Sequence, residues 1–136
     1  MKKYVLAMCS AVVATILAFS CFSMIGKAAN EYEKNLERLT YIDNYGGNIS
    51  KGLLSTTVSA DITGKTGVTK VKIKMELQKL SDGNYSTIET WEQTFNSIEG
   101  SMSESKTTNP FSTYRLKATV TAYSGSNSES QTFYEY

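Results

Sequence analysis

An uninterrupted alternation of apolar and polar residues, VKIKMELQ at positions 71–78, constrains the fold more than any other feature of the sequence. Successive side chains of a β-strand point to opposite faces, so the apolar residues share one face and the polar residues share the other. One face is expected to be buried and the other solvated, as in an antiparallel sheet that covers a core. The segment therefore predicts a half-buried strand.

Two further runs show the same alternation. One face of residues 54–62 carries Leu54, Thr56, Val58, Ala60 and Ile62, and one face of residues 114–123 carries Tyr114, Leu116, Ala118, Val120 and Ala122. Weaker β-rich runs lie at 41–49, 98–105 and 131–136. About seven short strands, with no helical period after residue 40 and no internal repeat, predict an all-β fold, an antiparallel two-sheet sandwich.

Turn residues mark the connections between the predicted strands. Ser81-Asp82-Gly83-Asn84 is expected to close a hairpin, because Gly83 and Asn84 adopt positive φ at low cost. The apolar residues that follow, Tyr85, Ile88 and Trp91, are spaced by three, so a regular strand cannot place all of them on one face. This spacing predicts a bulge between residues 86 and 90. Further turn signals lie at 46–47, 64–67, 109–110 and 124–128.

The first 28 residues have the features of an export signal. A basic start at residues 1–3 precedes an uncharged, mostly apolar run at residues 4–25, and small residues follow at Gly26 and Ala28. We expect a signal peptide over residues 1–28, with cleavage after Ala28 or, second, after Ala29, and a secreted, extracellular product.

Two alternatives to cleavage remain for this segment. A run of about 20 apolar residues can also span a bilayer, but the polar residues within the run and the small residues after it favour cleavage. Cys21 could instead accept a lipid, although the large Phe19 and the non-aliphatic residue at position 18 disfavour a lipoprotein signal.

The mature chain is expected to consist of a flexible or briefly helical lead-in at residues 29–39 and one β-sandwich domain at residues 40–136. Cleavage removes Cys9 and Cys21, so the domain must be stabilised by its core rather than by disulfides. It also removes three of the fourteen basic residues and none of the thirteen acidic ones, which leaves a net charge of −2. This charge offers no electrostatic basis for binding nucleic acid.

Several passages carry a resemblance to known proteins. They are Leu77-Gln78-Lys79, Asp82-Gly83-Asn84-Tyr85 with Ile88 and Trp91, Tyr114-Arg115-Leu116, and Ser128-Glu129-Ser130. Together they resemble a family of small exported proteins from Firmicutes, which are Gram-positive bacteria, whose function is uncharacterised. The resemblance implies a fold and an extracellular location, but no activity and no site residues.

The end of the chain is also similar to the end of fibronectin type III and immunoglobulin-like domains. In those domains a Tyr near the start of the penultimate strand bonds through its hydroxyl to the backbone a few residues upstream. Tyr114 occupies the corresponding position in this chain. The similarity implies an immunoglobulin-like sandwich in which Tyr114 makes that bond.

The residues that are missing restrict the chemistry. The chain contains no His, and the mature part contains no Cys, so Ser-His-Asp sites, Cys-His sites and the usual zinc sites are excluded. Carboxylates remain available to a small hydrolase, but Glu76, Asp82 and Glu129 lie at outward or turn positions, where solvated carboxylates are normal. We therefore expect no enzyme, no cofactor and no metal site, with a carboxylate-dependent extracellular hydrolase as the alternative.

Cations and aromatic residues are the candidates for ligand binding. If the strands around Val71 and Leu116 pair, the outward residues Lys70, Lys72, Lys74, Arg115 and Lys117 form a basic stripe suited to an anionic wall polymer. Such lysines also serve merely to keep a sheet soluble.

More aromatic residues are present than a core of this size needs: Tyr85, Trp91, Tyr123, Phe133, Tyr134 and Tyr136. Exposed rings stack on sugars or contact a partner, and Trp91 and Tyr123 are the two that we select as site candidates. Trp91 is alternatively the central core residue. We expect a non-catalytic module that binds a protein or a cell-envelope glycan and that meets the membrane only transiently, through its signal peptide.

Overall fold

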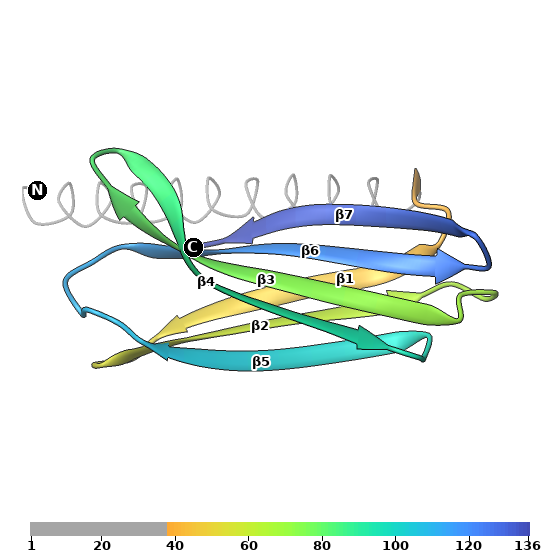
Figure 1. The fold of residues 1–136 in the computed structure, drawn as a ribbon, viewed down its shortest axis with the longest axis horizontal. Helices are drawn as coiled ribbons and strands as arrows, with labels where there is room; N and C mark the ends of the chain where they lie inside the picture. Colours follow the sequence, from red (N-terminus) through yellow and green to blue (C-terminus); the bar gives the residue numbers. More distant parts are fainter. Residues whose placement is uncertain (1–37) are drawn as a thin grey trace, which may run out of the picture. The chain divides into compact units, whose positions relative to one another are not determined.

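The computed structural model describes residues 38–136, which form seven strands (Figure 1). The strands are β1 (Ile42–Lys51), β2 (Ser55–Gly64), β3 (Lys70–Ser81), β4 (Asn84–Phe95), β5 (Glu99–Thr107), β6 (Tyr114–Ser124) and β7 (Asn127–Glu135). The predicted signal peptide and nearly all of the predicted lead-in lie outside the described residues. Within residues 38–136, no helix has the length and apolar character needed to span a membrane.

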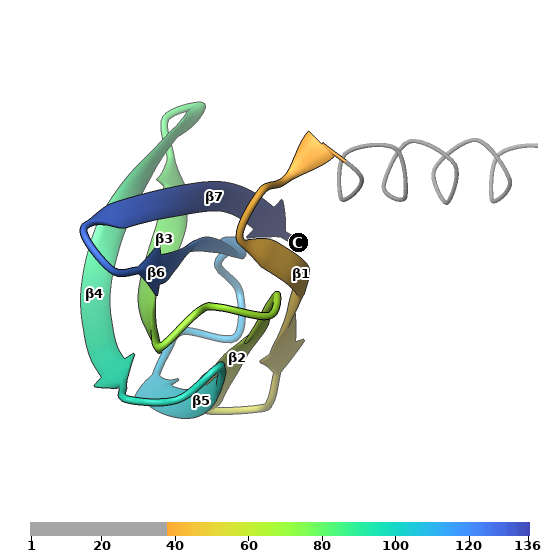
Figure 2. The ribbon, with the colours of Figure 1, turned by 90° about the vertical axis from the view of Figure 1, so that its right-hand side faces the viewer.

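The strands form two antiparallel sheets. One sheet has the order β1-β2-β5, and the other has the order β4-β3-β6-β7. Figure 2 shows the two sheets facing each other when viewed along the strands. The structure therefore confirms the predicted all-β sandwich of two antiparallel sheets, and its seven strands lie between Ile42 and Glu135.

The core lies between the sheets and is built by the three alternating runs. On β3 the apolar residues of positions 71–77 are fully buried, and their polar neighbours are half-buried on the outer side. The other large contributors are Val58, Ala60 and Ile62 of β2 and Leu116, Ala118, Val120 and Ala122 of β6, each at most 1% exposed. Burial of a Val, Leu or Ile side chain contributes roughly 1.5–3 kcal/mol, so this layer dominates the stability of the domain.

The hairpin between β3 and β4 has the predicted position and an unpredicted detail. Ser81 pairs with Asn84, and the two turn residues with positive φ are Asp82 (52°) and Gly83 (79°). Asn84, which we expected in that conformation, instead begins β4. Two successive positive φ values match the twist of a two-residue hairpin.

The predicted bulge is also present. Leu77 pairs with Glu89 and Gln78 pairs with Thr87, so Ile88 is the extra residue on β4. Beyond this point the hairpin projects from the rest of the sheet (Figures 1 and 2). A bulge bends its strand and increases the local twist, which accounts for the projection.

Three sequence expectations about strand boundaries are wrong. Gly46 and Gly47 do not form a turn but lie inside β1, where they pair with Asp61 and Ala60. Strand β7 begins at Asn127 rather than at residue 131, because the β6–β7 turn is tight and uses Gly125 at a φ of 60°. Leu54, assigned to the buried face of β2, precedes that strand and is 67% exposed.

On each side of the sandwich, a Phe ring from the four-stranded sheet packs over a glycine of the three-stranded sheet. A Cβ atom on Gly47 of β1 would lie 2.7 Å from the ring of Phe133 of β7, and one on Gly100 of β5 would lie 2.5 Å from the ring of Phe95 of β4. Phe133 also contacts Tyr45, with ring centroids 5.2 Å apart. Each glycine thus provides the space into which a ring from the opposite sheet packs.

Candidate ligand-binding face

The predicted basic residues share the outer face of the four-stranded sheet. Strands β3 and β6 are neighbours, with Lys70 opposite Tyr123, Glu76 opposite Lys117 and Gln78 opposite Arg115. Directly paired residues lie on the same side of a sheet. We call the set Lys70, Lys72, Lys74, Arg115 and Lys117 the basic face; the pairing of β3 with β6 is what brings it together.

Two carboxylates lie among these cations: Glu76, which shares the polar face of β3, and Glu92, which sequence reasoning did not place there. Glu92 of β4 lies 2.9 Å from Lys72, and Glu76 lies 3.2 Å from Lys117 and 3.9 Å from Lys74. The hydrogen bond that the Lys72 ammonium donates to Glu92 raises the pKa of Lys72. Five cations and two carboxylates leave three positive charges, so the basic face attracts anions less strongly than its lysine content suggests.

Arg115 differs from the lysines in its surroundings. Its guanidinium lies 3.9 Å from the ring centroid of Tyr85, 4.6 Å from that of Tyr134 and 6.0 Å from that of Tyr136. We call these three residues the tyrosine cluster. Stacking on aromatic rings favours the planar guanidinium, and Tyr134 and Tyr136 still expose 43% and 76% of their surface.

Hydrogen bonds orient the guanidinium without neutralising it. Arg115 donates from Nε to Gln78 Oε1 at 2.8 Å and from a terminal nitrogen to the Tyr136 hydroxyl at 3.3 Å. Among residues 38–136, no carboxylate forms an ion pair with Arg115. A guanidinium that is fixed by hydrogen bonds, has no carboxylate partner among the described residues and lies beside exposed rings can bind a ligand with two features. These are an anionic group for the guanidinium and a ring that stacks on the tyrosines.

The other end of the basic face carries a second cation–ring pair. The Lys70 ammonium lies 4.3 Å from the ring centroid of Tyr123. A shallow hollow of about 190 Å³ lies beside it, lined by Lys72, Lys74, Glu92, Thr119, Thr121, Tyr123, Ser128 and Ser130. Of the two aromatic candidates, Tyr123 therefore belongs to the basic face.

Trp91 does not. It pairs with Met75, which is fully buried, so its side chain points to the inner side of the sheet. It lies on an outer strand of that sheet and remains half-buried. Trp91 is thus neither the central core residue nor a part of the basic face.

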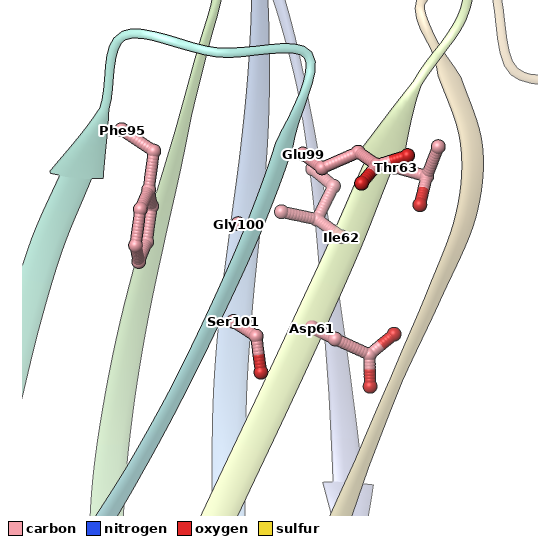
Figure 3. Close-up of a pocket in the computed structure, with 7 residues that line it drawn as sticks. All are labelled: Asp61, Ile62, Thr63, Phe95, Glu99, Gly100 and Ser101. Atoms are coloured by element: carbon pink, nitrogen blue, oxygen red, sulfur yellow. The ribbon is translucent and has the colours of Figure 1, made fainter.

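A larger hollow, of about 340 Å³, lies where β2 and β5 meet the end of β4 (Figure 3). Asp61 and Glu99 line it together with Phe95. The Asp61 carboxylate points away from the Phe95 ring (Figure 3) and lies over Gly46, whose Cβ position would be 3.5 Å from Oδ1. Both carboxylates are solvent-exposed. In a glycosidase, two carboxyl groups flank the bond to be cleaved, and the exposure of Asp61 and Glu99 does not by itself indicate such a pair.

Neither metal chemistry nor similarity to known proteins assigns a function to these sites. Residues 38–136 contain no cluster of three or more acidic, His or Cys side chains able to hold a metal ion. Comparisons with protein families, curated proteins and solved structures find no match for the chain. The basic face is consequently the best-defined candidate site, on geometric grounds.

Proposed function

We propose that the chain is a secreted, non-catalytic β-sandwich module that binds an anionic cell-envelope glycan on the basic face. The observation that carries this proposal is Arg115, held among three tyrosine rings and without a carboxylate partner in the described part of the chain. Sugar rings stack on exposed aromatic side chains, and a guanidinium binds phosphate or carboxylate through paired hydrogen bonds.

The extent of the face supports an extended ligand. Arg115 and Tyr123 mark its two ends on β6, and at a rise of roughly 3.3 Å per residue the distance between them is about 26 Å. Thr119 and Thr121 lie between them on the same side of the strand. A linear polymer lying along β6 would meet rings at both ends and hydroxyl groups with lysines in the middle.

The origin of the domain forms part of the same proposal. Export through the signal peptide at residues 1–28, and descent from an immunoglobulin-like or fibronectin type III-like sandwich of a Gram-positive exported family, are proposed from the sequence. The division of seven strands into three and four supports the second point. So does the Tyr114 hydroxyl, which accepts a hydrogen bond from the Asn109 N–H at 3.0 Å.

Replacement of Arg115 tests the proposed function. Arg115→Gln should weaken binding of a purified poly(glycerol phosphate) wall polymer with sugar substituents by about tenfold or more, because a charge-assisted hydrogen bond contributes roughly 1.5–3 kcal/mol. Lys51→Gln, which removes an exposed cation outside the basic face, is the control with the same change in net charge. Calorimetric titration of the two variants and the unaltered chain gives the comparison. Equal affinities for the two variants, or no binding by the unaltered chain, would reject the glycan and favour a protein ligand.

A further inference from the structure

Three large apolar side chains are exposed together at one end of the sandwich. Leu53 and Leu54 lie in the β1–β2 loop and are 81% and 67% exposed, and Phe111 lies in the β5–β6 loop and is 95% exposed. We call these three residues the apolar tip. The two loops lie at the same end of the strands (Figure 1).

The loops are held to each other. The Thr108 N–H donates to the Leu54 carbonyl at 3.0 Å, and the Lys51 ammonium donates to the Ser112 carbonyl at 2.7 Å. Just below them, the buried hydroxyls of Thr56 and Thr108 bond at 2.8 Å. The fold therefore holds the two loops together and keeps their apolar side chains in solvent at the same end of the sandwich, although burying them would stabilise the domain.

The two loops of the apolar tip contain no acidic residue, and Lys51 at the end of β1 adds a cation beside the two leucines. An exposure of 95% means that Phe111 contacts almost nothing of its own domain, so the tip protrudes instead of lining a groove. A protrusion of Leu and Phe with a neighbouring Lys suits a lipid interface, which takes up apolar side chains without a shaped pocket and attracts cations to anionic headgroups.

We propose that the apolar tip inserts into the surface of a lipid bilayer. Insertion buries Leu53, Leu54 and Phe111 among acyl chains and leaves Lys51 at the level of the headgroups. The basic face runs along one side of the sandwich, with its Arg115 end toward the apolar tip and its Tyr123 end away from it. Lipid contact at the tip therefore leaves the Tyr123 end of the basic face open. This contact is additional to the transient membrane passage expected of the signal peptide.

A tryptophan placed in the tip tests insertion in the full chain, whose apolar leader contains no Trp. In a Trp91→Phe background, Phe111→Trp gives the tip probe and Ile98→Trp gives a control at the opposite end of the strands, in the β4–β5 turn. Vesicles of phosphatidylglycerol and phosphatidylcholine carry brominated acyl chains as a quencher. Insertion predicts a blue shift and loss of emission for the Phe111→Trp chain that exceed those for the Ile98→Trp chain, since leader binding alone brings both probes to the vesicle.

Equal responses of the two probes, or emission of the tip probe that stays as in buffer, would overturn the proposal. Removal of the tip by Leu53→Ser and Leu54→Ser in the Phe111→Trp chain should restore the buffer-like emission. Sedimentation without vesicles addresses the rival occupant. If the chain self-associates and Leu53→Ser with Leu54→Ser abolishes that association, the tip is an interface with a second copy and the lipid proposal is wrong. Thermal melts confirm that each variant is folded.

Discussion

At the scale of single residues, Tyr114 connects the β5–β6 loop to the core. Its side chain is only 7% exposed, and its hydroxyl accepts the hydrogen bond of the Asn109 backbone. Tyr114→Phe should lower the free energy of unfolding by about 1 kcal/mol, the usual contribution of one hydrogen bond. Tyr123→Phe is the matched control, because the Tyr123 hydroxyl has no hydrogen-bond partner among the described residues. Urea unfolding of both variants measures the difference, and equal midpoints would show that the bond is dispensable.

Glu129 fixes the start of β1. Its carboxylate accepts hydrogen bonds from the backbone N–H groups of Thr40 at 2.9 Å, Tyr41 at 2.7 Å and Ile42 at 3.0 Å. Burial by itself raises the pKa of Glu129, but the three backbone bonds and the charge of Lys65 outweigh it and hold the pKa below the ordinary 4.5. The ionised form is therefore the one that stabilises the fold.

The direction of this shift predicts a pH dependence. A carboxyl group whose pKa is lower in the folded state stabilises the protein above its unfolded pKa, and the contribution is lost as the pH falls through the folded pKa. Glu129→Gln should cost about 1 kcal/mol at pH 7, a figure reduced for partial exposure. Below pH 4.5 the gap between the variant and the unaltered chain should close. Urea unfolding across this range measures it, and a gap independent of pH would show that ionisation of Glu129 does not matter.

At the scale of strands, β1 is held against β7 by the fit of Phe133 over Gly47. A Cβ atom at Gly47 would lie 2.7 Å from the ring and 2.9 Å from the Ser59 carbonyl oxygen, whereas one at Gly46 meets nothing closer than 3.5 Å. Gly47→Ala should destabilise the domain by about 1–3 kcal/mol through overpacking. Gly46→Ala should be neutral or slightly stabilising, since a strand glycine carries an entropic cost. Thermal unfolding of the two variants compares adjacent positions, and similar melting temperatures would contradict the packing argument.

Gly47 also shows why some strands could be predicted from the sequence and others could not. Residues 71–78 and 114–123 follow the period of two, because burial on one face determines which side chains they carry. Gly46 and Gly47 were misassigned to a turn because Gly47 makes room for Phe133, a contact between residues far apart in the chain. Local pattern predicts strands well where one face is buried, but it does not reveal contacts between sheet edges.

At the scale of the whole molecule, the candidate site could be predicted only in part. Residues placed by the local sequence pattern could be predicted, and residues placed by contacts between distant strands could not. The cations of β3 and β6 could be placed on one face, because period-two geometry fixes their side once the two strands pair. Glu92 could not be placed, because its position beside Lys72 depends on the β3–β4 register, which the bulge at Ile88 shifts by one residue. The cluster around Arg115 could not be predicted either, since its rings come from β4, from β7 and from the last residue, Tyr136.

The charge balance of the basic face predicts opposite effects on ligand affinity for two substitutions. Glu92→Gln removes one of its two carboxylates and should strengthen binding of the poly(glycerol phosphate) polymer, whereas Lys70→Gln should weaken it. Each change should be about twofold at low salt, the effect of one charge at roughly 10 Å in water, and should diminish at physiological ionic strength, where the screening length is about 8 Å. Stability should change little, because the contribution of an exposed ion pair is at most about 1 kcal/mol. Titrations of both variants at two salt concentrations measure the signs; shifts in the same direction would show that contacts other than charge determine binding on this face.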